Sequence, residues 1–381
     1  MKIPLFKIFW DEEDIRAVNE TIKKGMYWTS GPQSKEFEKM IAEYIGTKYA
    51  VVFNSGTSAL HATVLAHNIK EGYEAIVPSF TFIATANALL FAGAKPVFAD
   101  IETKTFGLDP EDVKEKITDK IKAIIPIHYG GSPCLIRELK EIADDHNLIL
   151  IEDAAEAFGA RIKNKKVGTF GDSAMLSFCQ NKVITTGDGG AAVTDSREIY
   201  EKLKLIRAHG RLEDTDYFSS WKHMDYVTLG YNYRMSDITA ALGIAQLEKI
   251  DKIIQMRRRN AEYMNNKLSK IRNISLPKPL SDDYFHVYQM YTVRVKEGQG
   301  LRDNLAEYLT MKGITAKVYF SPVHLTHFYK NELNYDCKLL ATEEVSRQVL
   351  TLPMYPSLTT EEMDYIAEEI KAFFSEGCDE K

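Results

Sequence analysis

The chain contains 381 residues, of which 45% are hydrophobic and 27% are charged, a composition typical of folded globular proteins rather than disordered, collagen-like or coiled-coil chains. At roughly 150 residues per domain, this length favours two to three domains. The formal net charge is −6 at pH 7, which disfavours nucleic acid as a partner because phosphate-tracking surfaces usually carry a basic surplus.

The cysteines and the N-terminus indicate a cytoplasmic protein. The four cysteines form no CxxC pair, which argues against a structural zinc site or a disulfide scaffold and fits a reducing compartment. The nine histidines contain no pair at the i, i+4 spacing of metal ligands, so no metal is expected. No membrane association is expected either, because no apolar stretch approaches the ~20 residues of a membrane span and the first residues lack a secretory apolar region.

The chain begins with two predicted helices, at 11–24 and 34–45, and then alternates between short apolar runs and amphipathic segments. We expect strands at 49–53, 75–77, 96–98, 121–127, 148–151, 174–178 and 190–194. Helices are expected between them at 58–67, 83–91, 110–117 and 135–146. This alternation predicts an α/β fold with a mainly parallel central sheet flanked by helices, in which ligands bind beyond the carboxyl ends of the strands.

The second half of the sequence predicts a smaller unit. A helix at 198–207 and a polar, aromatic loop at 211–229 precede a long helix at 236–268. We predict that this helix joins a large domain, residues 1–250, to a small C-terminal α/β domain, residues 251–381. The small domain is expected to contain strands at 290–295 and 315–319 and helices at 302–312, 341–348 and 360–374.

Several common signatures are missing from the sequence. It contains neither the GxGxxG dinucleotide fingerprint nor the GxxxxGK[ST] phosphate loop, and neither HExxH nor GxSxG.

Two other segments follow predicted strands. Asn54–Leu60 combines small residues with hydroxyls at a helix start and suits a phosphate cradle, although alone it fits an ordinary capped helix N-terminus better. The segment Glu152–Glu156 places acidic residues at the end of a strand that should be buried. A buried carboxylate needs a cationic partner, although the same acids also suit the cap of the next helix.

Two later segments add a lysine and an arginine. The segment Ser177–Gly190 places Lys182 in a glycine-rich loop after a predicted strand. A lysine that is partly removed from water there can act as an amine nucleophile, although most loop lysines are simply solvated. Gly230–Ser236 contains an amide, a guanidinium and aromatic rings, and it also suits a plain helix start.

Together, these segments predict a pyridoxal phosphate site. The aldehyde of this cofactor needs a lysine, its phosphate needs N–H and hydroxyl donors, and its ring nitrogen needs a carboxylate to remain protonated. Lys182, Asn54–Leu60 and Asp153 would supply these three groups.

The same segments, with 78–87, resemble the DegT/StrS family of pyridoxal-phosphate-dependent sugar aminotransferases, which have the aspartate-aminotransferase-type fold (fold type I). The resemblance implies that Lys182 binds the cofactor's aldehyde and shuttles the proton, that Asp153 pairs with the ring nitrogen, and that Glu156 lies near the ring's 3-oxygen. The other implied cofactor contacts are Gly56, Thr57, Ser58 and Ser177 at the phosphate, Phe82 on the ring face, and Asn232 from the partner in a homodimer with shared active sites.

The resemblance also implies the reaction. A dehydratase branch of the family has histidine in place of the lysine, so Lys182 favours transamination. L-Glutamate would load the cofactor as pyridoxamine phosphate, and a nucleotide-linked keto-sugar would then receive the amine. Residues 153–156 and 181–190 are most similar to the perosamine-synthase branch, which aminates C4 of a GDP-linked 4-keto-6-deoxy sugar for surface polysaccharides such as lipopolysaccharide O-antigen. A C3-keto-sugar or cyclitol aminotransferase, or a non-catalytic regulatory protein of the same fold, are the alternatives.

The substrate contacts are less specific in the sequence. The candidates are Trp28, Arg234, Tyr319 and His324, each of which also suits packing or surface charge. The chain departs from the family at residues 128–131, which are His-Tyr-Gly-Gly where members often have His-X-aromatic-Gly. We therefore interpret His128 as a packing histidine.

Overall fold

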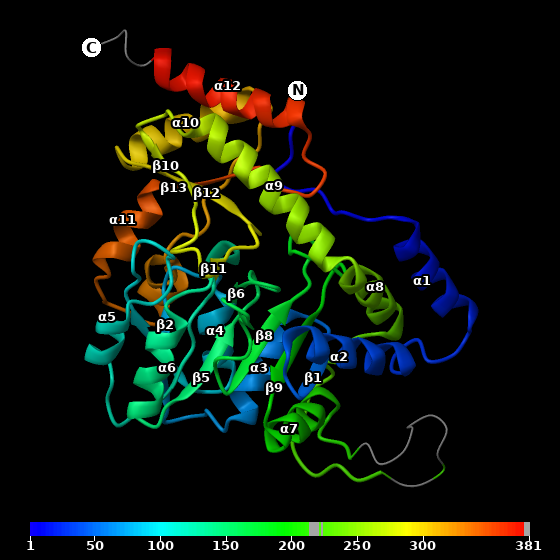
Figure 1. Ribbon diagram of the computed structural model, residues 1–381. Helices are drawn as coiled ribbons and strands as arrows, with labels where there is room; N and C mark the ends of the chain where they lie inside the picture. Colours follow the sequence, from blue (N-terminus) through cyan, green and yellow to red (C-terminus); the bar gives the residue numbers. More distant parts are fainter. Residues whose placement is uncertain (213–220, 222–223, 377–381) are drawn as a thin grey trace.

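The computed structural model describes residues 1–212, 221 and 224–376 (Figure 1). Within these residues, the central sheet has seven strands, in the order β1 (Tyr49–Phe53), β9 (Gly190–Thr194), β8 (Ser173–Ser177), β5 (Ile149–Asp153), β4 (Ile121–Ile124), β2 (Glu74–Pro78) and β3 (Lys95–Ala99). All neighbours are parallel except β9, which is antiparallel to β1 and β8. The other strands therefore end at one edge, where β9 begins.

Helices cover both faces of this sheet. One face packs against α3 (Gly56–Ala66), α4 (Ala84–Phe91) and α7 (Arg197–Arg207). The other face packs against α2 (Pro32–Ile45), α5 (Pro110–Glu115), α6 (Ile136–Asp145) and α8 (Asp237–Glu248), and α1 (Glu12–Lys23) lies against α8. Burial on both faces explains why the strands are almost continuously apolar, and the predicted fold class is confirmed.

The C-terminal part has its own core, drawn above the large sheet in Figure 1. A sheet of β10 (Ile274–Ser275), β12 (Tyr291–Val295) and β13 (Val349–Leu352) packs with α9 (Ile250–Leu268), α10 (Gln299–Met311) and α12 (Thr360–Glu376). α11 (Leu340–Gln348) precedes β13. Ile3 from the N-terminus also packs into this core and pairs with Ile314. The domain division at residue 250 stays a prediction.

Two predicted elements differ from the structure. The long helix at 236–268 is divided at Lys249, whose ammonium binds Asp14 of α1 at 2.8 Å, so that α8 lies on the sheet while α9 leads to the C-terminal core. The predicted strand at 315–319 is wrong. Lys317 forms a single bridge with Thr351, and the N–H of Thr315 donates to the carbonyl of Ile3. No strand continues because Val318 and Tyr319 pack on a separate apolar cluster.

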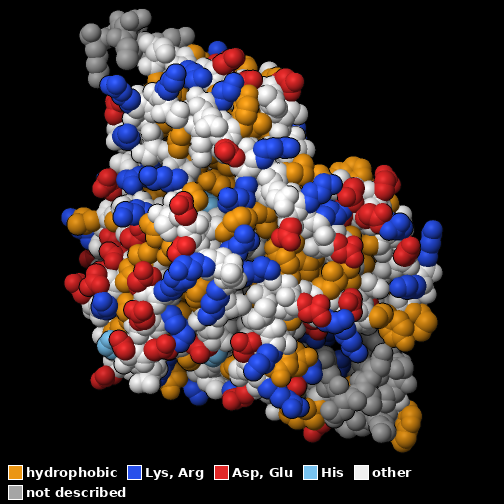
Figure 2. Space-filling model, viewed as in Figure 1, with side chains coloured by type: hydrophobic (Ala, Val, Ile, Leu, Met, Phe, Trp, Pro, Cys, Tyr) orange, Lys and Arg blue, Asp and Glu red, His pale blue; other side chains and the backbone are white. Residues whose placement is uncertain are grey.

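Some short elements have no counterpart in the sequence prediction. A second small sheet consists of β11 (Tyr284–Phe285), β6 (Arg161–Ile162) and β7 (Lys165–Lys166), and single turns of helix occur at Tyr129–Gly131, Val323–Leu325 and Phe328–Glu332. The predicted loop at 211–229 lies partly outside the described residues. Among the described residues, no helix combines the length and the apolar character of a membrane span. Figure 2 shows basic and acidic side chains intermixed over one face, in keeping with the near-balanced composition.

Candidate active site

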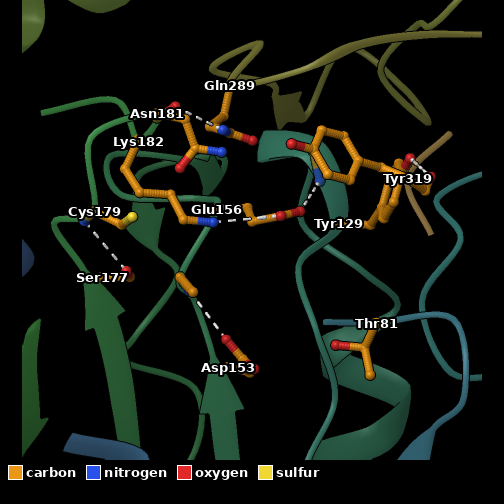
Figure 3. Close-up of polar contacts among 12 residues, drawn as sticks. Thr81, Tyr129, Asp153, Glu156, Ser177, Cys179, Asn181, Lys182, Gln289 and Tyr319 are labelled. Atoms are coloured by element: carbon orange, nitrogen blue, oxygen red, sulfur yellow. Dashed lines mark hydrogen bonds and ion pairs between the residues drawn. The ribbon is translucent and has the colours of Figure 1, made fainter. Parts of the chain in front are cut away.

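The carboxyl edge of the sheet brings four of the predicted cofactor residues together, namely Asp153, Glu156, Ser177 and Lys182 (Figure 3). Asp153 is the last residue of β5, and Ser177 is the last residue of β8. The turn from β1 into α3 lies directly beside Ser177, because a Cβ placed on Gly56 would be 2.9 Å from the Ser177 Cβ. Residues separated by more than 100 positions thus meet because β1 and β8, the two strands on either side of β9, end at the same edge of the sheet.

Lys182 is held by a buried carboxylate rather than solvated. Its Nζ lies 3.4 Å from the Oε1 of Glu156, and the two side chains are only 14% and 4% exposed. The Oε2 of Glu156 accepts a hydrogen bond of 2.9 Å from the backbone N–H of Gly130. The amine of Lys182 therefore occupies a defined position at the edge of the sheet.

Asp153 is buried and has neutral hydrogen-bond donors. The hydroxyl of Thr85 donates to Oδ2 at 2.8 Å, and the N–H of Ala155 donates to Oδ1 at 3.2 Å. Burial raises the pKa of Asp153, and the nearby charge of Lys182 only partly opposes this. A cationic ligand atom beside the carboxylate would relieve the cost of burying this charge.

The neighbouring acid, Glu152, points to the opposite side of the strand and has a structural role. Its oxygens accept hydrogen bonds from three backbone N–H groups, of Gly168, Phe170 and Gly171, and from the Nε2 of His128. His128 is fully buried, and its Nδ1 accepts from the N–H of Cys134. These contacts agree with the interpretation of His128 as a packing residue.

The start of α3, where the sequence predicts a phosphate cradle, lies at this edge of the sheet. Gly56 and Thr57 occupy the first turn of the helix, where backbone N–H groups have no helical acceptor and attract anions. The Oγ of Ser55 accepts from the N–H of Ser58 and so caps the helix. A Cβ on Gly190 would lie 2.6 Å from the backbone nitrogen of Gly56, so the close approach of β9 requires glycine at position 190.

The remaining predicted residues lie around this centre or away from it. Phe82 follows β2 and is 59% exposed, with its ring 6.5 Å from that of Phe320. Tyr319 projects toward the space beside Glu156 in Figure 3, and its carbonyl accepts from the hydroxyl of Tyr129. His324 is 1% exposed, and its Nδ1 lies 2.6 Å from the Oγ of Ser79, so its ring is enclosed by protein.

Three predicted residues lie on the β1 side of the molecule. The carbonyl of Asn232 lies 3.4 Å from the Nδ2 of Asn54, and Arg234 pairs with Phe53 at the end of β1. Arg234 also lines a cavity of about 1120 Å³ formed mainly by α2, α7 and nearby loops. Trp28 is 49% exposed, and its carbonyl accepts from the N–H at the start of α8.

The sequence prediction missed two groups that shape the site. Thr85 hydrogen-bonds Asp153 and lies one helical turn after Thr81, whose hydroxyl it contacts at 2.7 Å. Two hydroxyl residues spaced one helical turn apart near the end of a strand were the sequence feature that could have indicated this contact with Asp153. The N–H of Gly130 has no such signal, because its contact with Glu156 depends on a backbone turn with a positive φ of 61°.

The comparisons with known proteins identify the family. Residues 9–371 match the DegT/DnrJ/EryC1/StrS aminotransferase family, and the chain belongs to it. It is 35% identical over 374 residues to the GDP-perosamine synthase of Escherichia coli O157:H7, covering 98% of this chain and 99% of that protein. It is 39% identical over 332 residues to the GDP-perosamine synthase of Caulobacter vibrioides, covering 87% of each.

The structural comparison agrees with this assignment. A putative sugar aminotransferase from Streptococcus pneumoniae, in its PLP-form, superposes with a TM-score of 0.93 at 27% identity, over 99% of both chains. The predicted family, fold type I, enzyme class and cofactor are confirmed: the chain is a pyridoxal-phosphate-dependent sugar aminotransferase. The residues present fit this cofactor, because Asp153 is a buried carboxylate with neutral donors and α3 begins with free N–H groups.

Proposed function

We propose that this member of the family transfers an amino group from L-glutamate to C4 of a nucleotide-linked 4-keto-6-deoxy sugar, the reaction expected of a GDP-perosamine synthase. The observation that carries the proposal is the buried pair of Lys182 and Glu156 beside Asp153 at the end of β5. Two relatives that align over most of this chain are named GDP-perosamine synthase, which supports the choice of sugar and nucleotide.

Each residue of the site has a separate task in this proposal. When bound, pyridoxal phosphate supplies a reactive aldehyde and a ring that withdraws electrons. Thr85 and Ala155 fix the direction of the oxygens of Asp153, which would keep a proton on the ring nitrogen. The first turn of α3 and Ser177 would hold the phosphate, and Phe82 would cover the ring face.

Lys182 carries the proton between cofactor and substrate in both half-reactions. Its Nζ lies 3.4 Å from the Oε1 of Glu156, and Glu156 is itself anchored by the N–H of Gly130. The amine of Lys182 can act as the base in one half-reaction and as the acid in the other. This is possible because L-glutamate and the keto-sugar would react at the same atom of the cofactor. The low exposure of both side chains limits competition from water.

We also propose a homodimer in the cytoplasm that shares its active sites, with Asn232 reaching the phosphate held by the other subunit. Arg234 and Trp28 would then contact the nucleotide-sugar from that subunit, while Tyr319 would contact it from the same chain. The product would enter a surface polysaccharide such as O-antigen. Residues 1–250 would form the cofactor-binding domain and 251–381 the small domain.

The test is product analysis. The purified protein is incubated with L-glutamate and, in separate reactions, with GDP-, UDP- and dTDP-linked 4-keto-6-deoxy sugars, and each product is located by NMR. The proposal predicts a C4 amine on the GDP-linked sugar and no product from the Lys182→Ala variant. Amination at C3, or turnover of a different nucleotide alone, would contradict it.

A further inference from the structure

Gln289 has a buried oxygen that no described residue satisfies. The side chain is 4% exposed, and its Nε2 donates a hydrogen bond of 2.9 Å to the carbonyl of Asn181, next to Lys182. Its Oε1 is buried and has no hydrogen-bond partner within the described residues. Because the amide nitrogen faces Asn181, Oε1 faces the other way, toward the space beside Glu156 in Figure 3. A buried acceptor without a donor costs free energy, so this oxygen suits a ligand that brings one.

The backbone around Gln289 is held firmly against the site. The guanidinium of the buried Arg257 donates to the carbonyl of Gln289 at 3.2 Å, and the N–H of Met290 donates to the carbonyl of Gly130 at 3.0 Å. A Cβ on Gly131 would lie 2.9 Å from the nitrogen of Gln289, so the two segments touch. The turn that anchors Glu156 through Gly130 therefore also fixes Gln289.

The chemistry of the two substrates decides which one this oxygen recognises. An amide oxygen only accepts hydrogen bonds. Apart from its reacting amine, L-glutamate brings two carboxylates, which are acceptors at neutral pH and are repelled by a carbonyl oxygen. A keto-sugar brings hydroxyl groups, which donate. In Figure 3 the side chain of Tyr319 projects toward the same space from the opposite side.

We propose that Oε1 of Gln289 accepts a hydrogen bond from the sugar hydroxyl adjacent to the carbonyl that is aminated, and that Gln289 selects sugars carrying this hydroxyl. The inference rests on the proposed function, since it assigns a specificity contact within the same site. Gln289 acts on the sugar half-reaction, while its bond to Asn181 only orients its own amide.

The experiment measures the two half-reactions separately by the absorbance of the cofactor. Wild type, Gln289→Met, Gln289→Glu and the control Gln255→Met, at an exposed position on α9, are reacted with L-glutamate. Each loaded enzyme then reacts with the GDP-linked 4-keto-6-deoxy sugar or with its analogue lacking the hydroxyl at C3. Wild type and the control should prefer the hydroxylated sugar by about 10- to 100-fold in kcat/KM, the range for a buried hydrogen bond.

The variants separate recognition from a structural role. Gln289→Met removes the acceptor, so its preference should fall to about 3-fold or less, and its sugar half-reaction should slow more than its glutamate half-reaction. Gln289→Glu keeps an oxygen acceptor but loses the donor to Asn181, and it should retain most of the preference. Calorimetric titration with the aminated sugar and its 3-deoxy form should show the same pattern in binding.

Three results would overturn the inference. These are equal slowing of both half-reactions in Gln289→Met, a preference that survives in Gln289→Met, and a wild type that treats both sugars alike. If Gln289→Met does not fold, the wild-type preference and the retained preference of Gln289→Glu decide the question. Failure of wild type to react with L-glutamate would instead refute the proposed function, so the two failures are distinguishable.

Discussion

Replacing Glu152 by glutamine should destabilise the protein strongly although it changes one atom. The side chain is fully buried between β5 and the loop before β8. Oε2 accepts from His128 at 3.0 Å and from Gly168 at 2.8 Å, while Oε1 accepts from Phe170 at 2.7 Å and from Gly171 at 2.8 Å. Four donors therefore converge on one carboxylate.

The cost follows from counting acceptors. Glutamine offers one carbonyl oxygen and one NH₂ group, so whichever way the amide turns, two donors face another donor. His128 cannot become an acceptor at Nε2 by moving its proton to Nδ1, because Nδ1 already accepts a hydrogen bond of 3.2 Å from the N–H of Cys134. With each unsatisfied buried donor costing about 1–3 kcal/mol, Glu152→Gln should lower the free energy of unfolding by about 2–6 kcal/mol.

The assay is chemical denaturation of the cofactor-free protein, with Glu111→Gln as the matched control. The Glu111 side chain is 78% exposed and forms an i, i+3 ion pair with Lys114, so its replacement should change the free energy of unfolding by less than about 0.5 kcal/mol. A loss below about 1 kcal/mol for Glu152→Gln would refute the view that this carboxylate organises the loop.

Further predictions concern the other side of the strand and the cradle. Asp153→Asn should stabilise the cofactor-free protein at pH 7 while reducing turnover. Burial raises the pKa of Asp153 above its ordinary value of 3.8. The contribution of this group to stability is therefore complete below pH 3.8 and is lost as the pH rises through the raised pKa. Denaturation between pH 4 and 8 should show that slope in wild type and lose it in the variant. Thr85→Val should reduce kcat/KM by roughly 5- to 20-fold, because a hydrogen bond to a carboxylate contributes about 1–2 kcal/mol, and unchanged kinetics would argue against it. Gly190→Ala should cost about 1–3 kcal/mol of stability and weaken cofactor binding, since its Cβ meets the backbone of Gly56, whereas Gly300→Ala, in open space, should do neither.

Much of the fold and the cofactor site could be predicted because local patterns carry them. Apolar runs and the glycines after helices mark the alternation of strands and helices, and strand ends in a parallel sheet meet at one edge. That rule alone places Asp153 near Ser177. Lys182 follows Ser177 by five residues, which keeps it at the same edge.

The parts that could not be predicted depend on contacts between distant segments. The break at Lys249 reflects its bond to Asp14, and nothing in the helical pattern around it marks an end. The false strand at 315–319 has a suitable apolar pattern, but Thr315 and Lys317 bond to two different segments, at Ile3 and Thr351, and no continuous ladder forms. Gln289 gains its role from Asn181, more than 100 residues earlier, so no local motif could reveal it.

The central claim is that Lys182 binds the cofactor and carries the proton while the cofactor takes the amino group from L-glutamate. The most direct measurement is the visible spectrum of the protein with pyridoxal phosphate, before and after L-glutamate is added. Wild type and the control Lys163→Ala, at an exposed position, should show a yellow band that disappears with L-glutamate, and Lys182→Ala should lack the lysine-dependent band. A Lys182→Ala spectrum identical to that of wild type, or a band that ignores every amino donor, would contradict the account.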